Sequence, residues 1–151
     1  MGILDDLLAR VRYFNEGLDD GSFLSGIMER NEDEILALNT EEQLYERGIT
    51  SRGVRIDSYA PYSPLTIEIK KGLGQPYDHV TLRDTGAFER SFWLDFDHEK
   101  VWVEAFDAKT EELMAKYGDD ILGFTDENIG KIVRQFVFPD IMEIARKTLM
   151  I

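Results

Sequence analysis

Residues 92–105, which read FWLDFDHEKVWVEA, decide the fold class of this chain. In each half of the stretch an apolar row occupies every second position, a period of two that is typical of β-strands. The polar run 97–100 separates the two halves. We therefore predict an antiparallel β-hairpin with strands over 92–96 and 101–105.

This predicted hairpin carries apolar side chains on both of its faces. Trp93 and Trp102 lie in the register opposite to the row formed by Phe92, Leu94 and Phe96. Either the sheet is covered on both sides within the domain, or one face meets another subunit. Because a lone hairpin is marginal in water, a further strand would come from the long arm that precedes it or from a neighbouring subunit.

Helical patterns precede the hairpin. Apolar residues at steps of one, three and four predict a helix over 3–14, which Gly17 and the cluster at 19–21 should end. A second helix is predicted over about 22–47, with Gly48 as its stop. The two helices would form a helical hairpin of unequal arms.

Helical patterns also follow the hairpin. A short helix is predicted over 110–117, closed at Gly118. Thr125 is a typical N-cap of a further helix, and Pro139 should restart the last one. The predicted fold class is therefore α+β, with a small antiparallel sheet built on the hairpin, in a single domain over 1–151.

A long arm, residues 49–81, connects the helical hairpin to the rest. It holds three of the four prolines and lacks a regular apolar pattern. Loops of this length are usually functional or become ordered on contact with a partner. Within the arm, Ser63 followed by Pro64 indicates a helix start, and this short helix should end at Gly72.

The stretch after the arm, residues 82–88, reads LRDTGAF. It predicts an extended piece, a turn and then a helical turn. Gly86 is expected in a turn with positive φ or in tight backbone contact, because glycine has no Cβ to clash there.

The charge is acidic and unevenly distributed. Thirty acids against 17 bases give a net charge of −13, which repels nucleic acids and anionic lipids. Residues 1–50 hold 12 acids and 4 bases, residues 51–90 hold 5 and 6, and residues 91–151 hold 13 and 7. We therefore predict that the middle segment meets carboxylates of a neighbouring subunit or of another protein that joins it. The candidate interface residues, with the two tryptophans, are Arg52, Arg55, Lys70, Lys71, Arg83, Trp93 and Trp102.

Several functional classes are disfavoured by composition. The chain has no cysteine, which removes disulfides, thiolate zinc sites and cysteine nucleophiles. Its apolar runs are only a few residues long, so a membrane span is not expected. Residues 1–20 carry acids inside an amphipathic pattern, unlike a signal peptide.

Three motifs resemble chemical sites but have a simpler structural explanation. Residues 117–120, YGDD, match a short polymerase signature, yet the chain is too small for a polymerase cleft and the motif also fits a helix end. His98 lies among the acids Asp95, Asp97 and Glu99, but neighbouring strand residues point to opposite faces. Residues 70–74 lack the spacing of a phosphate loop.

We therefore predict that the chain has no catalytic, cofactor or metal site and that the protein is not an enzyme. The remaining histidine, His79, has no nucleophile motif nearby.

Three stretches together resemble the phage virion-morphogenesis proteins of the tail-completion type. They are Ser-Pro-Leu-Thr at 63–66 with two lysines after it, Leu-Arg-Asp-Thr-Gly at 82–86, and residues 116–125 continuing to Pro139. The match covers roughly residues 35–145. It departs from the family pattern where Tyr59 or Tyr62 replaces a tryptophan, and where a Pro-Arg-Pro-Phe motif is reduced to the single proline.

The resemblance implies a non-enzymatic, homo-oligomeric ring at the head–tail junction of a tailed phage. Such a ring would contact other head, neck or tail proteins and let genomic DNA pass without specific binding. It would be assembled in the host cytoplasm and remain in the virion, with no cofactor and no membrane. An acidic lumen agrees with this role, because it does not grip DNA.

A small acidic inhibitor of the DNA-mimic type is the alternative. Such a protein should present regularly spaced carboxylates along one face. In this chain the acids are interleaved with bases and mostly lie opposite apolar stripes, which counts against mimicry.

Overall fold

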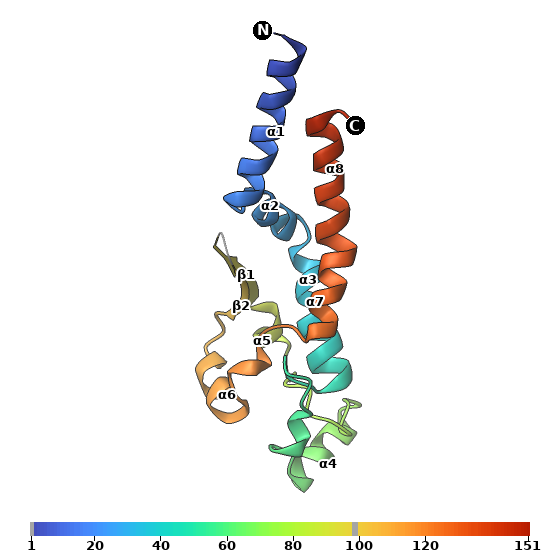
Figure 1. Ribbon diagram of the computed structural model, residues 1–151. Coiled ribbons are helices and arrows are strands. Elements are labelled where there is room, and N and C mark those ends of the chain that lie inside the picture. The colour runs from blue at the N-terminus through green and yellow to red at the C-terminus, as the bar shows by residue number, and fades with distance from the viewer. Residues whose placement is uncertain (1, 98–99) are drawn as a thin grey trace.

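A computed structural model describes residues 2–97 and 100–151 of the chain. It is mostly helical with one small antiparallel sheet, which confirms the predicted α+β class (Figure 1). The elements in chain order are α1 (Ile3–Asp19), α2 (Ser22–Arg30), α3 (Glu32–Ala37), η1 (Leu38–Arg47), η2 (Ile56–Ser58), α4 (Pro64–Gly72), α5 (Ala87–Arg90), β1 (Phe92–Phe96), β2 (Val101–Ala105), α6 (Thr110–Tyr117), η3 (Asp119–Ile121), α7 (Asp126–Ile132), η4 (Val133–Val137) and α8 (Phe138–Leu149). Of these, η1 and η4 are π-helical, and η2 and η3 are single 3₁₀ turns.

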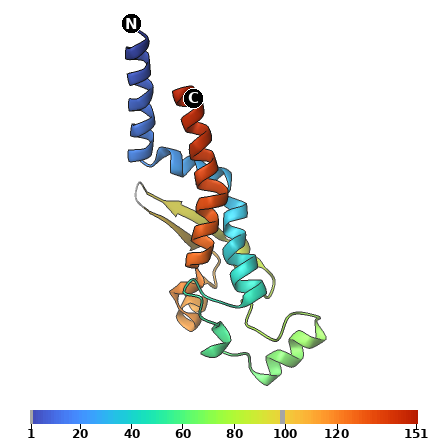
Figure 2. The ribbon, with the colours of Figure 1, turned by 45° about the vertical axis from the view of Figure 1, so that its right-hand side comes forward.

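The molecule is elongated. At one end α1 and α8 run antiparallel, side by side, and project beyond the rest of the chain (Figures 1 and 2). At the other end lies α4, whereas the hairpin and α6 flank the middle. The buried core lies in this middle part, where α2, α3 and η1 meet the hairpin, α6 and α7.

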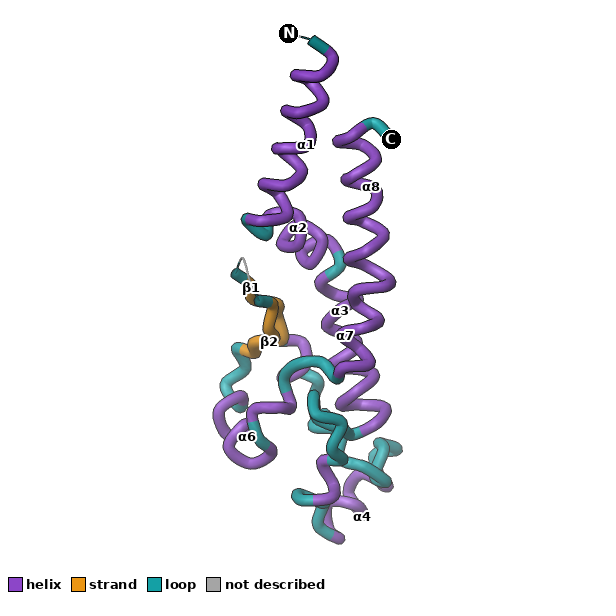
Figure 3. Tube along the Cα trace, in the orientation of Figure 1, coloured by secondary structure: helices purple, strands orange, loops and turns teal. Residues whose placement is uncertain are grey.

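The hairpin forms as predicted, with strands over the predicted residues. Phe92 pairs with Ala105 and Leu94 with Val103, so these side chains share the face that packs on the core. Among the described residues no further strand joins the pair, as the tube in Figure 3 shows. Of the two expected sources of a further strand, the arm therefore supplies none among the described residues, and a strand from a neighbouring subunit stays a prediction. His98 and Glu99, in the predicted turn, lie outside the described residues.

The N-terminal helices differ from the prediction at two points. Gly17 does not end α1, which continues to Asp19. Instead it makes room for an aromatic ring, because a Cβ at Gly17 would lie 2.3 Å from the ring of Phe23. The second predicted helix is interrupted at Asn31 and becomes π-helical from Leu38.

Other predicted turn and cap positions are confirmed. Gly48 follows η1 with φ +61°, and Gly86 precedes α5 with φ +83°. The Ser63 hydroxyl accepts from the Thr66 amide at 3.2 Å and caps α4. Thr125 caps α7 in the same way.

The last two predicted helices are joined. α8 has Pro139 in its first turn, as expected, but no loop separates it from α7 because η4 connects the two. A π-helical turn of this kind is a known way to carry a helix past a local irregularity such as a proline. The result is one long helical rod that runs from the middle of the molecule to its projecting end (Figure 1).

The arm is ordered at both of its ends. Ile49, Ile56 and Val80 are buried in the core, so the arm is anchored where it leaves η1 and where it returns. Its middle carries α4, whose Leu65 is 71% exposed.

Candidate functional site: an apolar groove and a projecting helix

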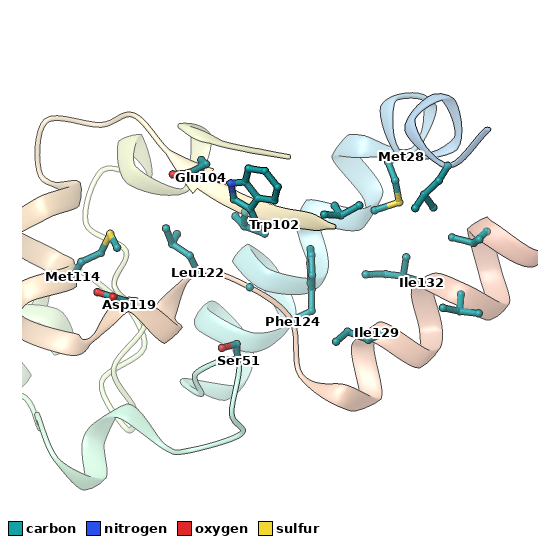
Figure 4. A pocket seen from close by; sticks show the side chains of 16 residues that line it. Met28, Ser51, Trp102, Glu104, Met114, Asp119, Leu122, Phe124, Ile129 and Ile132 are labelled. Atoms are coloured by element: carbon teal, nitrogen blue, oxygen red, sulfur yellow. Dashed lines mark hydrogen bonds between the residues drawn. The ribbon is translucent and has the colours of Figure 1, made fainter. Parts of the chain in front are cut away.

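An open groove of about 580 Å³ lies between β2 and the C-terminal helical rod (Figure 4). Apolar side chains from four parts of the chain line most of it. They are Leu24 and Met28 of α2, Val101, Trp102 and Val103 of β2, Met114, Leu122 and Phe124 before the rod, and Ile129, Ile132, Val133 and Val137 of the rod. A groove of this size and character fits a row of apolar side chains better than a polar ligand.

The two ends of the groove differ in charge. Figure 4 places Asp119 beside Met114 and Leu122 at one end, and Met28 beside Ile132 at the other. The lining has two charged side chains, Asp119 and Glu104, and both are acidic. Within the part of the chain that the structure describes, neither of them forms an ion pair, although Glu104 accepts a hydrogen bond from the Trp102 indole at 2.8 Å.

A buried amide network fixes the loop that forms the floor of the groove. The Asn39 side chain donates to the Ile121 carbonyl at 3.0 Å and accepts from the Gly123 amide at 2.8 Å. The Gln43 side chain donates to the Gly123 carbonyl at 2.9 Å and accepts from the Thr125 amide at 2.9 Å. Both side chains are fully buried, so these bonds form in a low-dielectric environment where an unpaired partner would be costly.

The same network reaches α7. Asn128 donates from its side chain to the Gln43 oxygen at 2.8 Å, and its backbone amide donates to the Thr125 hydroxyl. As a result η1, the loop and the start of the rod are held as one unit. The wall and the floor of the groove are thus preorganised.

A long row of exposed apolar side chains lies on α1. Its side chains Ile3, Leu4, Leu7, Leu8 and Val11 are all exposed, Leu4 to 68%. Over the whole of this fully described helix, Gly17 is the single buried residue, and α8 has none. A continuous exposed stripe of this kind is uncommon on a chain that stays monomeric.

Two arginines flank the α1 stripe. Arg10 pairs with Asp6 at 2.9 Å and also reaches the Thr148 carbonyl of α8. Arg12, one turn after Leu8, has no ion pair within the described ranges 2–97 and 100–151.

The predicted basic interface residues are partly engaged within the chain itself. Arg83 bonds Glu41 at 2.6 Å and stacks on the Tyr45 ring at 3.9 Å. Lys70 is nearly buried and donates to the Arg83 carbonyl at 3.3 Å. The structure brings these two residues together, and neither offers a free charge to a neighbour.

The other three basic residues remain at the surface. Arg52 is the most open, with its side chain 82% exposed and 3.9 Å from Asp120. Arg55 holds Asp57 through two hydrogen bonds and keeps the pKa of that carboxyl below its ordinary value.

Lys71 lies near Glu68 and over the Tyr77 ring. The structure thus places the basic residues in separate local contacts and not in one common patch.

The two tryptophans share one face of the hairpin, because Trp93 opposes Glu104 and Trp102 opposes Asp95. Trp93 is exposed, whereas Trp102 is half-buried and borders the groove. Their part in a subunit interface stays a prediction.

Among the described residues, one buried acid has no hydrogen-bond partner for its carboxyl group. Glu89 of α5 is 8% exposed, and neither of its carboxyl oxygens has a hydrogen bond. Burial raises the pKa of the Glu89 carboxyl above its ordinary value, because the charged form loses its hydration there.

The chemical motifs have structural roles in the folded chain. Gly118, with φ +98°, ends α6, and Asp119 and Asp120 begin the turn η3, which is the helix end expected as the alternative to a polymerase motif. Among the described residues, no group of three or more His, Asp and Glu side chains is placed to hold a metal ion. None of the described helices has both the length and the apolar character needed to cross a membrane.

Sequence reasoning missed the groove and the amide network. The one signal was the spacing of Asn39 and Gln43, which places both amides on one face of a helix. That pattern alone is as compatible with an exposed polar face.

Comparison of the chain with protein-family models, with curated proteins and with solved structures finds no match. The resemblance to phage tail-completion proteins therefore rests on the sequence stretches that carry it.

Proposed function

We propose that this protein is a structural subunit of a tailed-phage virion that assembles into a ring at the head–tail junction. The observation that carries the proposal is the uncovered apolar stripe of α1 (Ile3–Val11), on a projecting pair of helices that buries a single residue. Such a surface marks a protein interaction site. Together with the three resembling stretches, it supports an assembly subunit over an enzyme.

The charge supports the same role. A net charge of −13 gives a ring whose lumen repels the phosphate backbone, so genomic DNA passes without specific binding. The subunits must then hold together through apolar contacts and a few oppositely charged pairs. Of the predicted basic contacts, Arg52, Arg55 and Lys71 have exposed side chains to offer.

The test is the mass of the assembled species. Native mass spectrometry of the purified chain, alone and mixed with the head, neck and tail proteins of its phage, should show a closed oligomer or its incorporation into a neck complex. Immunogold labelling of purified virions should place the chain at the head–tail junction. A chain that stays monomeric in every mixture and is absent from virions would contradict the proposal, and a tight complex with a DNA-binding enzyme would favour the DNA-mimic alternative.

A further inference from the structure

We infer that α1 of one copy docks into the groove of the next copy, so that each subunit contributes one helix and one groove. This inference rests on the proposed homo-oligomeric ring and names the contact that builds it. It joins two apolar surfaces that the fold leaves uncovered, the convex stripe of α1 and the concave groove beside β2.

The two surfaces match in shape and chemistry. Leu4, Leu7, Leu8 and Val11 recur at the i, i+3, i+4 and i+7 spacing by which an amphipathic helix binds an apolar groove. The groove is lined mostly by aliphatic, methionine and aromatic side chains and is held open by the buried amide network. Methionines such as Met28 and Met114 adapt readily to an incoming side chain.

A copy does not fill its own groove in this structure. Helix α1 is attached to its own chain through the Phe14 and Phe23 rings, whose centroids are 5.7 Å apart, and through Gly17. It points along α8, away from the hairpin (Figures 1 and 2). On α1, Arg10 reaches the Thr148 carbonyl of α8, whereas the side chains of the stripe remain exposed and are available to another molecule.

Charge selects the orientation. The charged side chains that line the groove are the acids Asp119 and Glu104, and neither forms an ion pair within the described chain. Arg12, at the C-terminal end of the stripe, has no ion pair with any residue that the structure describes. We therefore place Arg12 at the Asp119 end of the neighbour's groove and Leu4 toward the Ile132 end.

This contact is heterologous, because a patch on one subunit meets a different patch on the next. Contacts of this type generate rings when the rotation closes. A symmetric contact between two α1 helices would instead give a dimer and leave every groove empty. The two arrangements predict different behaviour in a mixing experiment.

The experiment uses two full-length variants that each lose one surface. Leu4→Asp with Leu8→Asp disables the helix, and Ile129→Asp with Val133→Asp disables the groove; all four side chains are exposed, so the monomer should stay folded. Each variant alone should be monomeric by native mass spectrometry. Mixed in equal amounts, they should form a 1:1 dimer that grows no further, since just one intact helix and one intact groove remain to pair.

A charge exchange tests the orientation. Arg12→Glu and Asp119→Arg should each weaken assembly about tenfold, and the double variant should recover most of that loss.

Leu65→Asp is the matched control for the Leu4→Asp, Leu8→Asp variant, because Leu65 is an aliphatic side chain of similar exposure on α4. It should leave assembly unchanged.

The outcomes separate this inference from the proposed function. If the unmodified chain assembles but the mixed variants remain monomeric, or Leu65→Asp disrupts assembly as strongly as the α1 variant, the contact is elsewhere and the helix-in-groove inference fails while the ring stands. If circular dichroism shows the variants to be folded and the charge exchange restores nothing, the orientation is wrong. If the unmodified chain never assembles and is absent from virions, the proposed function itself fails.

Discussion

The middle of the molecule and its projecting end are both helical, but they bury different kinds of surface. In the middle, η1 and α7 enclose the fully buried amides of Asn39, Gln43 and Asn128, which bond to one another or to a loop. At the end, α1 and α8 touch along one edge and leave leucines exposed. The difference teaches that the middle holds the buried core of the chain and leaves an apolar groove open beside it, whereas the projecting end has almost no buried side chains of its own.

The largest expected effect breaks the complete region. Gln43→Ala removes the side chain that joins Gly123, Thr125 and Asn128, and it leaves their buried polar groups unpaired. The free energy of unfolding should fall by about 3–5 kcal/mol. Urea denaturation measures this fall, and Gln135→Ala, at an exposed position of η4, should change stability by less than about 0.5 kcal/mol. Equal losses in both variants would show that the network adds little.

The second prediction detaches the projecting end. Gly17→Val places side-chain atoms inside the volume of the Phe23 ring, which must move away. We expect a loss of about 1–3 kcal/mol, confined to α1, so amide hydrogen exchange should accelerate in α1 and stay slow in η1. Gly26→Ala is the control, because a Cβ there meets just one arginine atom, at 3.7 Å. Acceleration throughout the chain would mean that the two regions unfold together.

The third prediction concerns the one buried acid of the middle region that lacks a partner. The pKa of Glu89 is raised in the folded chain, so the native state favours the protonated carboxyl. At pH values just above the ordinary pKa of 4.5, the native state therefore binds more protons than the unfolded state. Stability from this group is therefore highest below that pH and falls as the pH rises. Glu89→Gln should be more stable than the unmodified chain at pH 7, with the advantage gone near pH 4. Thermal melts across this range measure it, and an advantage that persists at pH 4 would point to packing instead of charge.

The smallest expected effect is the change in monomer stability when the exposed leucines of α1 are replaced. Leu4→Asp with Leu8→Asp should shift the free energy of unfolding of the monomer by less than about 0.5 kcal/mol, because both side chains already lie in water. Thermal denaturation at a dilution where the unmodified chain is also monomeric measures this. A large loss would show that the stripe is covered within the single chain.

The sequence by itself determined the local elements. The alternation in residues 92–105 set the hairpin and its register, Ser63 and Thr125 set helix starts, and Gly48 and Gly86 set positive-φ turns. These features depend on residues a few positions apart, whose preferences act without the rest of the fold. The acidic charge is likewise a property of composition alone.

The tertiary structure alone decided which of these elements are covered. Gln43 finds its partners 80 or more residues away in the sequence, and the space beside Gly17, inside α1, is taken by the Phe23 ring of α2. Local sequence patterns do not predict such pairings. The amphipathic stripe of α1 could therefore be predicted from the sequence, but its exposure in the folded chain could not. The same holds for the arginines. Arg83 contacts Glu41 and Tyr45, whereas Arg12 has no ion pair with the residues that the structure describes, because burial and pairing are set by which segments the whole chain brings together.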